Sequence, residues 1–327
     1  MGLSTGAIFI MFAVSAAGTL VPVISQKIPK MQHNSIFMEA IRAFSFGVVL
    51  ATGLIHMVSE GIENLSDEAL GPIVEEYGCL GLAIVLITMI VLQFIEAESV
   101  IFFAGGGSML HGHGHSHGHG DSNTNDSDGS TPESPSSQDH SGVSIDRDEP
   151  YLSVVSAEKK TAAHNANIRR KVATIIFEAG VIFHSVIVGL DLGVTTGPKF
   201  NTLLTALSFH QFFEGVAIGS AAVTTTKSKT KLFMINFAFA ITTPIGQAIG
   251  IGVRSTYDSE STTALWVQGV FDCVAGGILL YTGVVELLTY NMTTNQKFLS
   301  RSTLQRYALY ACLWSGAGLM ALIGKWS

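Results

Sequence analysis

The sequence predicts an all-α integral membrane protein with eight transmembrane helices. Hydrophobic residues make up 47% of the 327 positions and charged residues only 13%, and the mean hydropathy is +0.41. These values exceed what a water-soluble globular protein needs. Eight apolar runs also approach the ~20 residues that cross the hydrocarbon core of a bilayer as a helix, and each is too long for a barrel strand.

The eight predicted helices cover approximately residues 2–24, 36–59, 79–103, 172–195, 200–224, 231–253, 264–288 and 307–325. We therefore expect helices 1–3 in residues 1–103, a cytoplasmic, His-rich and largely disordered loop in 104–170, and helices 4–8 in 171–327. The first run follows no positive residue, and the first basic residue is Lys27. This pattern favours a transmembrane helix over a cleaved signal peptide.

Single polar residues distinguish some of these runs from plain hydrophobic spans. Pro244 stands near the middle of the sixth run, where it removes a helical hydrogen bond and either kinks the helix or frees a carbonyl for an ion. Asp272 lies deep in the seventh run and needs a partner that the sequence does not identify. The fourth and fifth runs carry His184, Asp191, His210, Gln211 and Glu214.

Lysine and arginine positions predict the orientation. Alternate loops carry the basic residues, which are Lys27, Lys30, Lys159, Lys160, Arg169, Arg170, Lys171, Lys227, Lys229, Lys231, Lys297, Arg301 and Arg306. The opposite loops contain only Lys199 and Arg254. The basic loops are therefore expected in the cytoplasm and both termini outside the cell or in a lumen, with the plasma membrane as the expected location. Asn64 then begins an outward glycosylation acceptor, Asn-Leu-Ser.

The polar segment between the third and fourth runs contains a histidine tract. Its histidines alternate with Gly or Ser and are His111, His113, His115, His117 and His119. Such a tract can gather imidazoles around a metal ion, although a neutral solubilising linker is the alternative. The tract therefore predicts metal handling, but it does not distinguish transport from buffering or sensing. The net charge of −7 argues against a nucleic-acid partner.

Two histidines lie at matched depth in the fourth and fifth runs. His184 precedes Thr196 by twelve residues, and His210 follows Lys199 by eleven, with a short outward hairpin between them. At ~1.5 Å per residue, both imidazoles lie roughly 16–18 Å from that end, near the bilayer midplane. Ionisable residues at this depth usually mark an ion or substrate path.

Helical spacing predicts which side chains can share a metal with these histidines. Glu214 lies four residues after His210 and three after Gln211. Asp191 lies two turns beyond His184, on nearly the same face. We predict a path from Asp191 inward to a cluster of His184, His210 and Glu214. A hydrogen-bonded packing role is the alternative for either histidine alone.

Small residues support a close approach of the fourth and fifth helices. Gly189 and Gly193 are four residues apart on one, and Gly215 and Gly219 are four apart on the other. This spacing is typical of membrane helices whose backbones approach closely. We expect these glycines to bring the two metal-site helices together.

Three further residues are weaker candidates for the metal pathway. His56 and Glu60 are four residues apart at the predicted outer end of the second helix, where they could collect ions or simply be solvated. Glu178 lies six residues before His184 on another face, and it could line an inner exit or pair with Arg170.

Two motifs carry a resemblance to a known family. Residues 183–193, from Phe183-His184-Ser185 to Gly193, and residues 210–219, beginning His210-Gln211-Phe212-Phe213-Glu214, resemble helices 4 and 5 of the Zrt/Irt-like (ZIP) metal transporters. Residues 47–57, 242–246 and 269–281 are similar to helices 2, 6 and 7 of that family. Eight spans and a His-rich loop after the third fit the same family.

The resemblance implies import of zinc, iron or manganese into the cytosol through a metal site on helices 4 and 5. The matching positions are His184, Ser185, His210, Gln211 and Glu214. The sequence departs from the family in two places. Asp191 replaces a usually small residue, and Val188 stands where some members carry a second carboxylate, so a two-metal centre is not expected. The sequence is compatible with a homodimer but does not determine the oligomeric state.

The predicted mechanism is alternating access without covalent chemistry, so no enzyme activity and no cofactor are expected. Ligands of nitrogen and oxygen without thiolate favour Zn²⁺, Fe²⁺ or Mn²⁺ over Cu⁺ but do not choose among the three. Zn²⁺ is the first expectation for the transported ion, with Fe²⁺ or Mn²⁺ next. The expected partners are divalent metal ions and the lipid bilayer. An exporter of the cation-diffusion-facilitator type and an intramembrane zinc hydrolase are the alternatives, but no His-Glu-x-x-His motif occurs.

Overall fold

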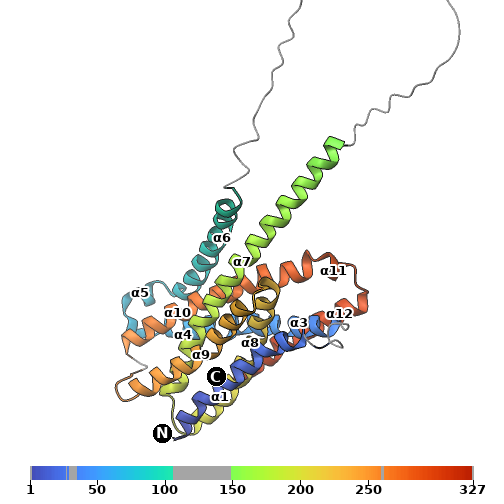
Figure 1. Cartoon of the computed structure of the whole chain (residues 1–327). Coiled ribbons are helices and arrows are strands. Elements are labelled where there is room, and N and C mark those ends of the chain that lie inside the picture. The colour runs from blue at the N-terminus through green and yellow to red at the C-terminus, as the bar shows by residue number, and fades with distance from the viewer. Residues whose placement is uncertain (1, 27, 29–34, 106–148, 259–260, 326–327) are drawn as a thin grey trace, which may run out of the picture. The chain divides into compact units, whose positions relative to one another are not determined.

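The computed structural model describes residues 2–26, 28, 35–105, 149–258 and 261–325, and this part of the chain contains helices and no strand. The elements are α1 (Gly2–Ser25), α3 (Ser35–Ala51), η1 (Thr52–Val58), α4 (Ser59–Asn64), η2 (Glu68–Leu70), α5 (Pro72–Glu76), α6 (Leu80–Gly105), α7 (Glu149–Val194), α8 (Pro198–Thr225), α9 (Lys229–Val253), α10 (Thr262–Tyr281), η3 (Thr282–Thr293), α11 (Gln296–Leu299) and α12 (Thr303–Ile323) (Figure 1). All eight predicted segments are helical, which confirms the all-α class.

Within the described residues, seven helical segments are long and apolar enough to cross a membrane. They are Ser4–Ser25, Ile36–Asn64, Leu80–Phe103, Lys160–Val194, Lys229–Val253, Thr262–Thr293 and Thr303–Ile323. The eighth predicted span corresponds to α8, which has 28 residues and is long enough to cross. Its buried polar side chains include His210, Gln211 and Glu214.

The chain divides into two compact units, Met1–Glu98 together with Arg169–Ser327, and Ser99–Ile168. The described part of the second unit consists of the end of α6 and the beginning of α7. The histidine tract at His111, His113, His115, His117 and His119 lies outside the described residues.

Helix α7 begins earlier than the sequence predicted. We expected a loop up to residue 170 and a helix from about 172, but α7 starts at Glu149. Pro150 lies in the first turn, where its missing N–H costs nothing, and residues 151–170 contain neither Gly nor Pro. The polar composition that indicated a loop is therefore compatible with helix in this stretch.

A sharp turn joins the end of α7 to the beginning of α8. Gly197 has a φ of 71°, a left-handed conformation that glycine adopts without strain, and Pro198 opens α8. Arg254 donates a hydrogen bond from Nε to the Gly193 carbonyl at 3.0 Å, which satisfies a carbonyl near the end of α7. The turn between α7 and α8 is therefore stabilised by the conformations of Gly197 and Pro198 and by the hydrogen bond from the Arg254 side chain.

Buried contacts hold the larger unit together. Helix α1 packs mainly on α8 and α9, α3 packs on α12, and α10 packs on η1 and α4. Helix α6 is joined to α10 by a polar contact, because the Tyr281 hydroxyl donates to Glu96 Oε2 at 2.6 Å. Glu96 also forms an ion pair with Arg169 of α7. A buried carboxylate therefore connects three helices.

The glycines of α7 and α8 pack against different helices from those we expected. A Cβ at Gly193 would lie 2.5 Å from the Gln247 carbonyl oxygen of α9, and one at Gly189 would overlap the Thr243 carbonyl oxygen. A Cβ at Gly219 would lie 2.5 Å from the Thr19 carbonyl oxygen of α1. The prediction that these glycines join the two metal-site helices to each other was wrong. They instead fix α7 on α9 and α8 on α1.

Candidate metal centre

Three side chains of α7 and α8 meet in the interior of the larger unit. His184, His210 and Glu214 offer ligand atoms that all lie within 4.8 Å of one another. His184 Nε2 lies 2.8 Å from His210 Nε2, and Glu214 Oε1 lies 3.2 Å from His210 Nε2 and 3.6 Å from His184 Nε2. All three side chains are buried, with at most 1% of each residue exposed.

The distances suit a single small cation. Two ligands at ~2.0–2.1 Å from a tetrahedral Zn²⁺ lie roughly 3.3–3.4 Å apart. The two histidine–glutamate distances of 3.2 and 3.6 Å bracket this value. The 2.8 Å between the two imidazole nitrogens is shorter, so the rings would separate by about half an ångström to admit the ion.

The buried polar atoms around this cluster lack protein partners. Neither imidazole Nδ1 has a hydrogen bond, and neither does the Ser185 hydroxyl or the Gln211 side-chain amide. Ser185 and Gln211 are fully buried. Leaving such groups unsatisfied is costly, and the buried Glu214 carboxylate adds a charge that needs a cation nearby. Ser185 and Gln211 are therefore buried polar side chains next in sequence to His184 and His210 that have no hydrogen-bond partner in the described part of the chain.

His56 lies deeper than the sequence predicted. We expected it at the outer end of the second helix, but its ring is 5% exposed and stands edge-on to His210 with 5.4 Å between ring centroids. Its Nε2 lies 3.4 Å from the Met320 carbonyl oxygen. The π-helical segment η1 contains His56, and such segments shift side-chain register and occur often at functional sites. The register shift places the imidazole beside the cluster.

Three acidic side chains, of α4, α7 and α10, interact electrostatically with one another. Glu60 and Asp191 are exposed, and their charges interact with each other. Asp272, 3% exposed, also interacts with both of them. Burial, together with the carboxylates of Asp191 and Asp272, raises the pKa of the nearby Tyr257 hydroxyl. No partner for Asp272 could be identified from the sequence, in which its depth in an apolar run was the only signal.

The remaining predicted positions lie apart from the cluster. Glu178 is half-buried on α7 and its Oε1 has no hydrogen-bond partner. No ion pair joins it to Arg170 among the described residues. Asn64 ends α4, and its Cβ lies close to Gly269 of α10. Glycosylation at Asn64 stays a prediction.

Comparison with known proteins identifies the family. The family model described as ZIP zinc transporter matches residues 1–324. The chain belongs to the ZIP zinc transporter family. This ZIP chain is 34% identical over 346 residues to zinc transporter 8 of Oryza sativa subsp. japonica, with 100% of the chain and 88% of the relative covered. It is 30% identical over 311 residues to zinc transporter 3 of Arabidopsis thaliana, with 95% and 80% covered.

A fungal relative gives the same result. Zinc-regulated transporter 2 of Saccharomyces cerevisiae is 28% identical to this ZIP chain over 400 residues, covering 100% of the chain and 94% of the relative. The resemblance seen in the two helix motifs is thereby confirmed over the whole chain. The family is one of multi-pass membrane transporters and not of enzymes, which decides against the hydrolase and the cation-diffusion-facilitator alternatives.

Proposed function

We propose that this ZIP chain carries a divalent metal ion, Zn²⁺ in the first place, into the cytosol through the cluster of His184, His210 and Glu214. The observation that carries the proposal is the meeting of two imidazoles and a carboxylate within 4.8 Å in the buried interior. Neutral imidazole and ionised carboxylate are ligands for this class of ion. The names of the relatives add that these proteins are zinc transporters.

The donor set narrows the choice of ion. It contains nitrogen and oxygen and no thiolate, which disfavours Cu⁺ and leaves Zn²⁺, Fe²⁺ and Mn²⁺. The three cysteines lie elsewhere, with Cys79 exposed, Cys273 buried on α10 and Cys312 on α12. Ser185 and Gln211 supply further oxygen donors, which suit all three ions. Transport of iron and manganese beside zinc is therefore part of the proposal.

The pathway on either side follows from the polar residues on the same helices. We place the outer approach along Glu60, Asp191 and Asp272, whose carboxylates attract a hydrated cation. His56 comes next, since its ring contacts that of His210. Glu178, with an unpartnered carboxylate oxygen, is the candidate on the inner side. The ion would exchange water for protein ligands at the cluster and regain it on leaving.

Alternating access requires α8 to cross the membrane as the eighth span. Its buried face contains His210, Gln211 and Glu214, so the polar groups that lower its hydropathy face protein and not lipid. The basic loops set the direction, because their positive charge favours the cytoplasmic side. Uptake toward the cytosol, with both termini on the opposite side of a plasma membrane, is the corresponding orientation.

Uptake of radioactive zinc by cells that express the chain tests both the site and the direction. Cells with the intact chain should accumulate zinc above untransfected cells, whereas His184→Ala and Glu214→Ala should reduce accumulation to background at equal surface abundance. His164→Ala, an exposed residue of the same helix α7, serves as the control and should transport normally. Near-normal uptake by both cluster variants, or net zinc loss from cells with the intact chain, would refute the proposal. Competition by Fe²⁺ and Mn²⁺ in the same assay defines the substrate range.

A further inference from the structure

A second polar cavity, distinct from the metal cluster, lies where α8 and η3 end. Its volume is about 240 Å³, below the ~300–1,000 Å³ of pockets for drug-sized ligands. Four elements line it: α3, α7, α8 and η3. His184, His210 and Glu214 are not among the lining residues. The residues that line the cavity are therefore different from those of the His184, His210 and Glu214 cluster.

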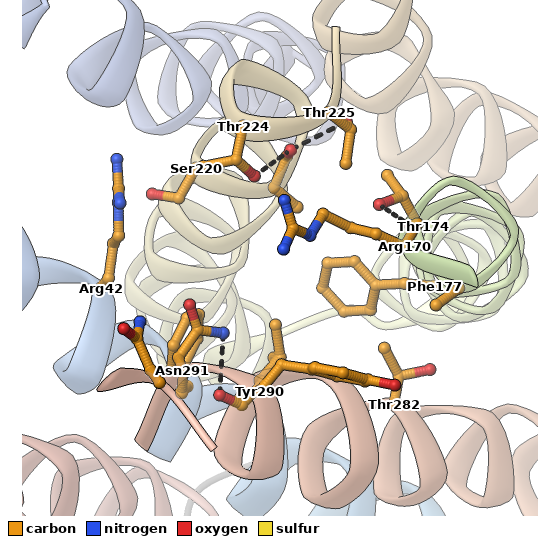
Figure 2. Close-up of a pocket in the computed structure, with 15 residues that line it drawn as sticks. Arg42, Arg170, Thr174, Phe177, Ser220, Thr224, Thr225, Thr282, Tyr290 and Asn291 are labelled. Carbon is orange, nitrogen blue, oxygen red and sulfur yellow. Dashed lines mark hydrogen bonds between the residues drawn. The ribbon is translucent and has the colours of Figure 1, made fainter. Parts of the chain in front are cut away.

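The charge of the lining is positive. Arg42 of α3 and Arg170 of α7 line the cavity, and the lining contains no aspartate or glutamate. Figure 2 shows the two arginines on opposite sides of the cavity, with Ser220 and Thr224 of α8 above and Tyr290 and Asn291 of η3 below. Two guanidinium groups repel a divalent cation, so the cavity is unsuited to the transported metal.

The arginines have donors available for a ligand. Arg42 Nε is buried and has no hydrogen-bond partner. The nearest opposite charge is Glu39, but its Oε1 already lies 3.0 Å from Lys297 Nζ and 2.7 Å from an Arg301 guanidinium nitrogen. Glu39 is therefore largely neutralised by two other cations. Arg170 is exposed at the end of the unit, and no ion pair involves it in the part of the chain that the structure describes.

Two hydroxyl groups reinforce the same conclusion independently of charge. Ser220 and Thr282 both line the cavity and are each 2% exposed, and neither hydroxyl has a hydrogen-bond partner. A buried hydroxyl without a partner is costly. An oxygen-rich ligand between the two arginines would supply the acceptor that the Ser220 hydroxyl lacks within the protein.

We propose that this cavity binds a phosphate-class oxyanion, between Arg42 and Arg170 and in contact with Ser220. Donors reach the cavity from α3, α7, α8 and η3, which suits the tetrahedral oxygens of phosphate better than a planar carboxylate. Guanidinium groups bind phosphate through paired, charge-assisted hydrogen bonds. The ligand is either free phosphate or the phosphomonoester headgroup of an anionic lipid, because the cavity lies at the end of the bundle near the basic loops.

Binding to the intact purified chain tests the proposal. Inorganic phosphate is titrated by calorimetry into the protein in neutral detergent, and the protein is also placed in phosphatidylcholine vesicles with or without phosphatidic acid, where its thermal midpoint is measured. Arg42→Gln and Arg170→Gln should each weaken phosphate binding by about tenfold or more. Lys231→Gln removes an exposed charge at the beginning of α9, outside the cavity, and should leave the affinity unchanged.

The two vesicle compositions distinguish the sources of the ligand. Binding of inorganic phosphate identifies a free anion, whereas stabilisation only by phosphatidic acid, lost in the same arginine variants, identifies a lipid headgroup. Ser220→Ala removes one hydroxyl without changing charge and should weaken binding by a few-fold, which keeps the test valid if an arginine variant misfolds. Binding equal in the intact chain and the arginine variants, an equal loss in Lys231→Gln, or no response to either ligand would overturn the proposal.

Discussion

Two polar regions lie along α7 and α8. The deeper one presents imidazole nitrogens and a carboxylate, whereas the one near the end of α8 presents guanidinium groups and hydroxyls. Both contain buried polar atoms without protein partners. The first region offers acceptor atoms to a cation and the second offers donor groups to an anion, so unsatisfied atoms of opposite character on one helix pair indicate ligands of opposite charge.

The environments of the two regions differ as well. The cluster of His184, His210 and Glu214 is fully enclosed, and each of these residues is at most 1% exposed. The cavity between Arg42 and Arg170 is less enclosed, because Arg170 is exposed. The cavity and the cluster share no lining residue. The comparison therefore predicts separate binding events that can be removed one at a time.

The largest effect should come from dissecting the two regions by mutation. His210→Ala removes a direct ligand and should weaken Zn²⁺ binding by more than about a hundredfold, because even second-shell changes at metal sites cost 10–100-fold. Phosphate binding should be unchanged in this variant. Arg170→Gln should show the reverse pattern. Calorimetry with each ligand on both purified variants measures this, and parallel loss of both affinities would contradict the separation.

A smaller effect should follow from lowering the pH. Protons compete with Zn²⁺ for the imidazole nitrogens of His184 and His210, because only the neutral ring binds a metal ion. The zinc affinity should therefore be lower at acidic pH than at neutral pH. Titration of the purified chain with Zn²⁺ at an acidic and at a neutral pH measures the change. A zinc affinity that does not fall on acidification would count against imidazole ligands.

The cluster of His184, His210 and Glu214 could be anticipated from the sequence because its geometry depends on quantities that a single chain determines. Depth follows from counting residues along a helix of known rise, and the pairing of His210 with Glu214 follows from the helical repeat. A short hairpin between the two helices then makes their proximity nearly obligatory. The metal-binding role of these residues stays a proposal.

Other features depend on contacts between helices that cannot be predicted from residue spacing along one chain segment. A π-helical register change moves His56 from the predicted outer end to the side of His210, and a fixed 3.6-residue repeat cannot anticipate it. The spacing of Gly189 and Gly193 predicted a close helix contact, but not that α9 is the partner. The Arg42–Arg170 cavity likewise joins helices whose adjacency is a property of the folded bundle.

A packing variant tests whether the metal region depends on the neighbouring helix. Gly189→Ala places a Cβ against the Thr243 carbonyl oxygen of α9, and such overpacking typically costs about 1–3 kcal/mol. The thermal midpoint should fall, and zinc affinity should fall with it because His184 lies on the displaced helix. Gly252→Ala on α9 meets nothing within 4 Å and is the control. An unchanged midpoint in Gly189→Ala would show that α7 can shift without cost.

The smallest effect should be at the outer approach, where charge guides the ion but does not bind it tightly. Asp191 is exposed and interacts electrostatically with Glu60, so Asp191→Asn should raise the KM for zinc uptake by about threefold through a slower encounter. The difference should shrink at high salt, because screening weakens long-range attraction between exposed charges and the ion. Glu76→Gln, an exposed acidic residue of α5, provides the matched loss of charge and should leave the KM unchanged. A salt-independent loss of maximal rate in Asp191→Asn would instead make Asp191 a direct ligand, and would extend the metal region to the outer end of α7.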